Sequence, residues 1–145
     1  MSKPARPEPA TLPVMASIRK EILIDARPGD AWAALRDWGG VHERLVPGFV
    51  TDARLDGEDR IVTFFTGAVA RERFVSLDDD AHRLVWSIVE SPLGMTHHNG
   101  AAQVVAENGR TRFVWVADIL PHELAAPVGE LMQRGIETIK ARLEA

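Results

Sequence analysis

Six strand-like runs follow one another between residues 49 and 120, and turn residues separate each run from the next. The separating positions are Asp56-Gly57, Thr66-Gly67, three aspartates at 78–80, the stretch from Pro92 to Gly94, and Asn108-Gly109. Asn-Gly and Asp-Gly pairs between strand-like runs are strong signals of β-hairpins. We therefore predict a meander of antiparallel strands at residues 49–55, 61–65, 68–77, 84–89, 96–105 and 111–120.

The chain ends in one long amphipathic segment. Between residues 127 and 143, apolar residues recur every three or four positions, and charged residues occupy the other side. The apolar side includes Val128, Leu131, Gly135 and Ile139. A helix of this length spans roughly 25 Å, so the pattern predicts one long helix with a single apolar face.

A strand and a helix are predicted ahead of the meander. Isoleucines at 18, 22 and 24 indicate a first strand with one buried face. Pro28 suits the first turn of a helix that ends before Gly39-Gly40, and a second short helical turn is predicted at 41–45. Residues 1–14 hold four of the nine prolines and show no periodicity. We therefore predict a flexible leader at 1–14 and one domain over 15–145.

These elements define an α+β fold. The first strand and the meander make a seven-stranded antiparallel sheet, with two short helices after the first strand. One face of such a sheet needs a cover, and the C-terminal helix carries the only large apolar stripe left in the sequence. The simplest packing wraps the sheet around that helix.

Composition excludes several classes of protein. The 145 residues contain no cysteine, which removes disulfide scaffolds, thiol nucleophiles and thiolate metal sites. The net charge is −4 and the basic residues are scattered, so we expect no nucleic-acid partner. No apolar run approaches the roughly 18 residues of a membrane span. We expect a cytoplasmic protein without membrane insertion, as a monomer or homodimer.

No metal or cofactor is predicted. His97 and His98 are adjacent on a predicted strand, so their side chains point to opposite faces and cannot bind one ion from the same face. The sequence also lacks a Gly-x-Ser-x-Gly elbow and a phosphate-binding glycine-rich loop. The commonest hydrolase and nucleotide-binding signatures are therefore absent.

Three segments resemble the START-like, birch-pollen-allergen-like helix-grip superfamily (SRPBCC), and within it the bacterial polyketide cyclase/dehydrase-type members. Residues 24–38, IDARPGDAWAALRDW, match the strand-to-helix opening of the family. Residues 67–74, GAVARERF, together with the acidic turn and 83–88, RLVWSI, are similar to its central hairpin. TRFVW at 111–115, Pro121 and the terminal helix complete a match over about residues 16–143.

The resemblance implies a deep pocket between the sheet and the long helix, used across the superfamily for hydrophobic small molecules. In the hormone-receptor branch, an acid at the place of Glu72 points into this pocket. Matching onward along the chain adds Trp86, Ile88 and His98 to the pocket-facing positions. Strand alternation agrees in part, because it places Glu72 with Phe74, Trp86 with Ile88, and His98 with Gly100 and Ala102.

The complete set of candidate site residues follows from the match, the strand alternation and the apolar face of the helix. The catalytic candidates are Glu72 and His98, and the ligand-binding candidates are Phe74, Trp86, Ile88, Gly100, Ala102, Trp115, Met132 and Gly135. In strand 111–120, the alternation does not decide between the face of Phe113 and Trp115 and the face of Val114 and Val116.

Glu72 is the sharpest candidate, because a carboxylate in an apolar cavity can act as a general base, an acid or a hydrogen-bond anchor. It also has a structural interpretation, since a glutamate between Arg71 and Arg73 is often a solvated cross-strand ion pair. His98 could pair with Glu72 to hold a ligand carbonyl or shuttle a proton near neutral pH, or it could be a strand or rim histidine with a water partner. Three functions follow: a hydrophobic-ligand carrier, a cyclase or aromatase using Glu72 and His98, or an interaction module with an exposed apolar patch.

Overall fold

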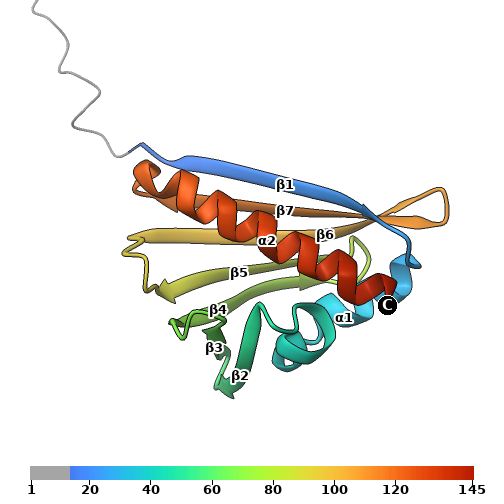
Figure 1. The fold of residues 1–145 in the computed structure, drawn as a ribbon, viewed down its shortest axis with the longest axis horizontal. Helices are drawn as coiled ribbons and strands as arrows, with labels where there is room; N and C mark the ends of the chain where they lie inside the picture. The colour runs from blue at the N-terminus through green and yellow to red at the C-terminus, as the bar shows by residue number, and fades with distance from the viewer. Residues whose placement is uncertain (1–13) are drawn as a thin grey trace, which may run out of the picture.

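The structure, a computed structural model, describes residues 14–145 (Figure 1). The predicted leader therefore lies outside the described residues, apart from Val14. The strands are β1 (Ala16–Ile24), β2 (Val50–Asp56), β3 (Asp59–Phe64), β4 (Val69–Asp78), β5 (Arg83–Glu90), β6 (His97–Glu107) and β7 (Arg110–Leu120). The α-helices are α1 (Pro28–Arg36) and α2 (Ala125–Glu144). The short helical turns are η2 (Trp38–Gly40), η3 (Val41–Leu45) and η4 (His122–Leu124).

The strands form one antiparallel sheet in the order β1-β7-β6-β5-β4-β3-β2. Each strand of the meander pairs with the next one along the chain, and β1 joins the far edge by pairing with β7. The α+β prediction is confirmed, including the seven antiparallel strands, the short helices after β1 and the long C-terminal helix.

The hairpin between β6 and β7 shows how the turn residues set the register. Asn108 and Gly109 both have positive φ angles, 53° and 80°. Tight two-residue hairpin turns require this left-handed backbone, which asparagine and glycine adopt at the lowest cost. The Asn-Gly signal therefore predicted the position of this turn correctly, and it pairs Glu107 with Arg110.

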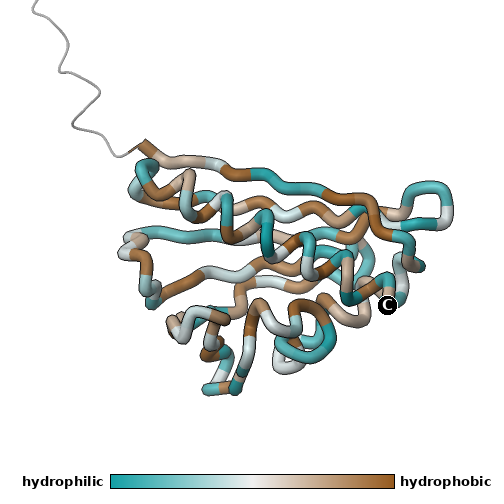
Figure 2. The backbone as a smooth tube through the Cα atoms, in the orientation of Figure 1, coloured by the Kyte–Doolittle hydropathy of each residue, from teal (hydrophilic) through white to brown (hydrophobic). Residues whose placement is uncertain are grey.

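One face of the sheet carries α2, which packs mainly on β1 and β7 (Figure 1). Its apolar side is buried at Val128, Met132, Ile136 and Ile139. Figure 2 shows apolar and polar residues alternating along the strands and around this helix. The hydrophobic core lies between the covered face of the sheet, α2 and the α1–η3 segment.

The structure decides the direction of the side chains in β7. Phe113, Trp115 and Ala117 face the same side as α2 and line a cavity there. Val114 and Val116 face the opposite side, beside Arg19. Among the residues that the structure describes, no helix has the length and hydropathy needed to cross a membrane.

Candidate functional site

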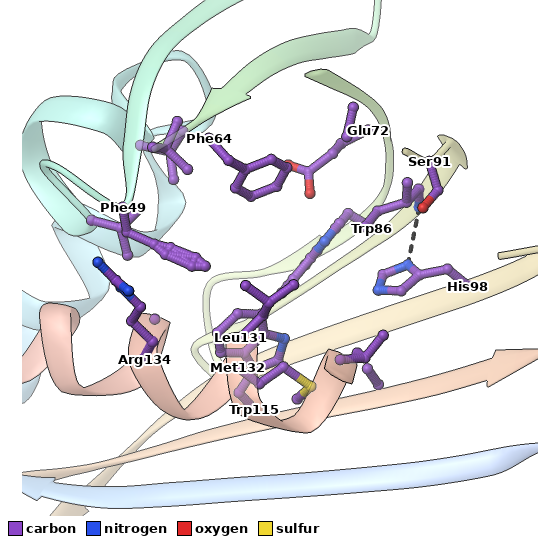
Figure 3. Close-up of a pocket in the computed structure, with 18 of the residues that line it drawn as sticks. Phe49, Phe64, Glu72, Trp86, Ser91, His98, Trp115, Leu131, Met132 and Arg134 are labelled. Carbon is purple, nitrogen blue, oxygen red and sulfur yellow. Dashed lines mark hydrogen bonds between the residues drawn. The ribbon is translucent and has the colours of Figure 1, made fainter. Parts of the chain in front are cut away.

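A cavity of about 580 Å³ lies between the sheet and α2 (Figure 3). The segment α1–η3–β2 closes one side through apolar residues such as Leu35, Leu45 and Phe49. The rim is formed by the turn after β3, the loop after β5 and the exposed side of α2. Cavities of roughly 300–1,000 Å³ are typical of small-molecule sites, so this one has the volume of a ligand pocket.

Most of the predicted site residues lie on the wall of this one cavity. The residues are Glu72, Trp86, Ile88, His98, Ala102, Trp115, Met132 and Gly135. They come from β4, β5, β6, β7 and α2, so the sheet and the helix together bring them to one place. The sequence analysis found them through the family resemblance and the alternation of the strands.

Phe74 and Gly100 lie outside the wall. Phe74 shares the inward side of β4 with Glu72, but it packs edge-to-face on Trp38, with ring centroids 5.6 Å apart. Gly100 is covered by two rings, because a Cβ there would lie 2.9 Å from His98 Cε1 and 2.9 Å from Trp86 Cε2. The small residue therefore leaves space for the rings of the wall, and the prediction of Gly100 and Phe74 as ligand-lining residues is wrong for this cavity.

Glu72 forms a buried ion pair. Arg60 lies opposite it across the β3–β4 hairpin, and Arg60 Nε donates to Glu72 Oε1 over 2.7 Å. Both side chains are less than a tenth exposed. Arg60 also donates to the carbonyl of Trp38 over 3.1 Å, and its guanidinium carbon lies 3.8 Å from the Trp38 ring centroid. The carboxylate is thus held rigidly at the cavity wall.

The neighbouring arginines do not bind Glu72. Arg71 and Arg73 point to the other side of β4, where both donate to Asp59, and Arg71 also donates to Asp56. Hydrogen bonds from Arg73 and Arg71 lower the pKa of Asp59. The cross-strand ion pair that we considered for Glu72 is present, but its partner is Arg60 and it is buried, whereas we expected a solvated pair.

His98 lies deep in the cavity wall and is only 4% exposed. Its Nδ1 accepts a hydrogen bond from the backbone N–H of Ile88 at 3.0 Å (Figure 3). An acceptor at Nδ1 places the proton of the neutral ring on Nε2. Burial lowers the pKa of His98 below its ordinary value, and the nearby Glu72 carboxylate opposes this shift only in part. The ring is therefore neutral at physiological pH.

Three rings from adjacent strands form a continuous aromatic wall. Trp86 lies between the other two, with its centroid 6.4 Å from that of His98 and 6.3 Å from that of Trp115. Glycines make room for these rings on both sides. Gly100 does so on the sheet, and Gly135 does so on α2, where a Cβ would lie 2.9 Å from Trp115 Cζ3. The two glycines explain how large rings and a cavity fit between one sheet and one helix.

The sequence analysis missed Arg60 and the rim. Counting outward from a two-residue Thr66-Gly67 turn pairs Ile61 with Glu72, one residue away from the observed partner Arg60, so the predicted turn did not indicate this pair. At the rim, the Arg134 guanidinium carbon of α2 lies 3.9 Å from the ring centroid of Phe65, which follows β3. This contact joins elements distant in sequence, and no local pattern indicates it.

No group of three or more metal-ligating side chains occurs within residues 14–145. His97 and His98 do diverge as the alternation predicts, since His98 is buried in the wall and His97 is exposed. The polar groups that line the cavity are carboxylate, guanidinium, imidazole and indole, together with the hydroxyls of Thr66 and Ser91. They can bind or move protons and hydrogen-bonding groups of an organic molecule.

Comparisons with known proteins agree with this geometry. A family model described as polyketide cyclase/dehydrase and lipid transport matches residues 15–144. A search of curated proteins found none that matches the chain.

Several solved structures are similar to this one. An uncharacterised protein from Bacillus thuringiensis has a TM-score of 0.80 at 17% identity, covering 88% of this chain and 98% of its own. The protein XoxI from Bacillus cereus has a TM-score of 0.77 at 17% identity, with coverages of 88% and 95%. A protein from Thermobifida fusca has a TM-score of 0.73 at 23% identity, with coverages of 88% and 92%. At these identities the likeness concerns the fold.

Proposed function

The chain belongs to the polyketide cyclase/dehydrase and lipid transport family, and from this premise we propose that it binds a hydrophobic small molecule in the cavity between the sheet and α2. The ligand classes that fit are lipid-like, polyketide and aromatic molecules. The cavity of about 580 Å³ carries the proposal, because a wall made mostly of apolar side chains gains free energy when a ligand removes it from water.

The cavity also favours this function over that of an interaction module. A module without a ligand needs an apolar surface on the outside of the molecule. Here, large apolar and aromatic residues such as Phe49, Trp86 and Met132 surround an internal space. A close-packed core without a cavity would be the more stable arrangement for a purely structural domain, because protein interiors are normally close-packed.

Native mass spectrometry of protein purified from its own host tests the proposal directly, since a co-purified ligand adds its mass to that of the chain. A neutral fluorescent probe, N-phenyl-1-naphthylamine, provides a second measurement. We expect its emission to rise and shift to the blue on binding to the cavity. Failure to retain any ligand and to bind the probe would overturn the proposal.

A matched pair of variants locates the probe. Ala102 lines the cavity, and its neighbour Ala101 lies on the opposite face of β6. Ala102→Leu fills part of the cavity and weakens probe binding by about tenfold or more, equivalent to about 1.4 kcal/mol. Ala101→Leu leaves probe binding unchanged. Equal effects of the two substitutions would show that the probe binds elsewhere.

A second candidate function is proton transfer of the cyclase or dehydratase type. The observation that favours it is that Glu72 and His98 line the same cavity. The molecule found by mass spectrometry is the substrate to try first. If the wild type converts this molecule, and if Glu72→Gln and His98→Asn each abolish the conversion, the protein is an enzyme that uses these two residues. Unchanged conversion in both variants rules out these two residues as catalysts.

A further inference from the structure

The interior of the cavity offers hydrogen-bond donors that the protein itself does not use. His98 Nε2–H has no acceptor among the described residues, although the ring is 4% exposed and lines the cavity. Figure 3 shows this nitrogen on the side of the ring that faces the cavity, while Nδ1 points to the backbone of β5. His98 Nε2 is not among the fully buried atoms without a partner, so it is accessible from the cavity and its proton is available to an acceptor from outside the chain.

The neighbouring Trp86 indole adds a second donor. Trp86 is 6% exposed and lines the cavity, and none of the described residues accepts a hydrogen bond from its Nε1–H. Trp115 Nε1 also has no partner within residues 14–145, but this atom is fully buried and so is not open to a ligand in the cavity. The three rings are contiguous in the aromatic wall. Ring N–H groups donate and do not accept, so this part of the wall recognises an acceptor.

The charges around the cavity decide what kind of acceptor fits. Arg60 and Glu72 are the ionised pair of the interior wall, and they neutralise each other across 2.7 Å. The other charged side chains of the cavity, Glu130 and Arg134, are exposed at the rim on α2. No unpaired cation of the described chain lies beside His98, so an anionic group at this depth would lose its hydration without a counter-ion.

Building on the proposed function, we propose that the ligand carries an uncharged carbonyl-type oxygen that accepts the hydrogen bond of His98 Nε2–H inside the cavity, with Trp86 Nε1–H as the second donor. The apolar body of the ligand fills the remaining space toward Phe49 and Met132. A pure hydrocarbon would leave the donors unsatisfied. A carboxylate would meet the negative Glu72 near His98 without gaining a cation.

Three probes on one rigid skeleton test this proposal. 9-Fluorenone carries one carbonyl, fluorene has a methylene group in its place, and fluorene-9-carboxylate carries a negative charge at neutral pH. Their dissociation constants are measured by displacement of N-phenyl-1-naphthylamine at pH 7.5. A net hydrogen bond changes affinity by about threefold to tenfold. We expect wild-type protein to bind fluorenone, and to bind the carboxylate at least about tenfold more weakly.

Variants assign the donor. His98→Asn keeps an oxygen acceptor for the Ile88 N–H and removes Nε2–H, while His97→Asn changes the exposed neighbour as a control. The ratio of the fluorene and fluorenone dissociation constants should fall about threefold to tenfold in His98→Asn and remain constant in His97→Asn. Trp86→Phe should reduce the same ratio of dissociation constants. This second variant keeps the proposal testable if His98→Asn fails to fold.

The infrared carbonyl band of bound fluorenone gives an independent readout. A hydrogen bond lowers its frequency relative to fluorenone in a hydrocarbon solvent, and His98→Asn should return part of this shift. A band at the hydrocarbon position, or a ratio that neither variant changes, overturns the proposal. Tight binding of the carboxylate also overturns it. In these cases probe binding still supports the hydrophobic cavity, whereas loss of all probe binding contradicts the proposed function itself.

Discussion

Arg60 and Glu72 face each other across the β3–β4 hairpin and form an ion pair with an Nε to Oε1 distance of 2.7 Å, with both side chains less than a tenth exposed. The pair stands at the wall of a cavity whose lining is mostly apolar. A buried pair of this kind is costly to break, because the remaining partner keeps its charge without compensation. It therefore fixes the Glu72 carboxylate in one position.

Breaking this pair should destabilise the protein more than removing it. Glu72→Leu leaves the Arg60 guanidinium unpaired and should lower the free energy of unfolding by about 3–5 kcal/mol. The double variant Arg60→Met/Glu72→Leu should recover most of the loss, because no buried charge remains. Urea denaturation measures both. The exposed pair of Arg19 and Glu21 is the control, and Glu21→Gln should cost about 0–1 kcal/mol.

A double variant as unstable as Glu72→Leu would contradict this prediction. Such a result would mean that the contacts of Arg60 with Trp38, through the carbonyl and the ring face, contribute more than the ion pair does. The comparison thus separates the charge of Arg60 from its packing.

Gly100 should be essential for the geometry of the aromatic wall. In Gly100→Ala, the new methyl group would approach Trp86 Cε2 and His98 Cε1 to 2.9 Å, so both rings must move. We expect a loss of about 1–3 kcal/mol in the free energy of unfolding, the usual cost of overpacking. Probe affinity should also fall, and the tryptophan emission spectrum should change.

Gly29 provides the matched control for that substitution. It lies in α1, and a Cβ there meets nothing within 4 Å. Gly29→Ala should therefore be neutral or stabilise the protein by up to about 1 kcal/mol. If the two substitutions had equal effects on stability and on probe binding, the contacts of Gly100 with the rings would not matter.

The stability of the protein should fall as the pH drops through the titration range of His98. Its pKa is lowered in the folded protein, chiefly by burial; the charges of Glu72 and Asp118 raise it and that of His97 lowers it further. In the unfolded chain the pKa is about 6.5. Below that pH the unfolded state binds a proton that the folded state still excludes, so unfolding is favoured.

Urea denaturation between pH 7.5 and 5 measures this loss, which is absent above the unfolded pKa. His98→Asn should flatten the profile in this range, whereas His97→Asn should leave it almost unchanged. The carboxyls of Asp59, Asp79 and Glu144 have lowered pKa values, so their contribution is lost at more acidic pH, below about 4. An unchanged slope in His98→Asn would refute the assignment to His98.

The fold was predictable because its signals are local. Turn pairs such as Asn108-Gly109 define the hairpins, and the apolar stripe of α2 defines the cover of the sheet. The family resemblance, with which the alternation agrees in part, then places Trp86 and His98 on the covered face. In β7 both faces are apolar, so the pattern could not choose between Phe113 and Val114, and only packing against α2 decides.

The parts of the site that escaped prediction depend on contacts between distant elements. Phe74 has the right alternation, but Trp38 from the segment after α1 covers it. The role of Gly100 depends on the ring positions of Trp86 and His98, which no sequence pattern specifies. Alternation predicts a direction from the strand, and the identity of the neighbour in that direction is a tertiary property.

The contact between Arg134 and Phe65 should control the rate at which ligands leave. It spans the rim from α2 to the turn after β3, with the guanidinium carbon 3.9 Å from the ring centroid. An exposed cation–π contact contributes about 0.5–1 kcal/mol, so Arg134→Ala should accelerate dissociation of N-phenyl-1-naphthylamine about twofold to fivefold. Because the same contact also hinders entry, the equilibrium affinity should change less than the dissociation rate.

Stopped-flow displacement measures the dissociation rate of the probe. Arg27→Ala is the control, because Arg27 is exposed before α1 and does not line the cavity. An unchanged dissociation rate in Arg134→Ala would show that ligands leave by another part of the rim, and the loop after β5 would then be the next segment to test.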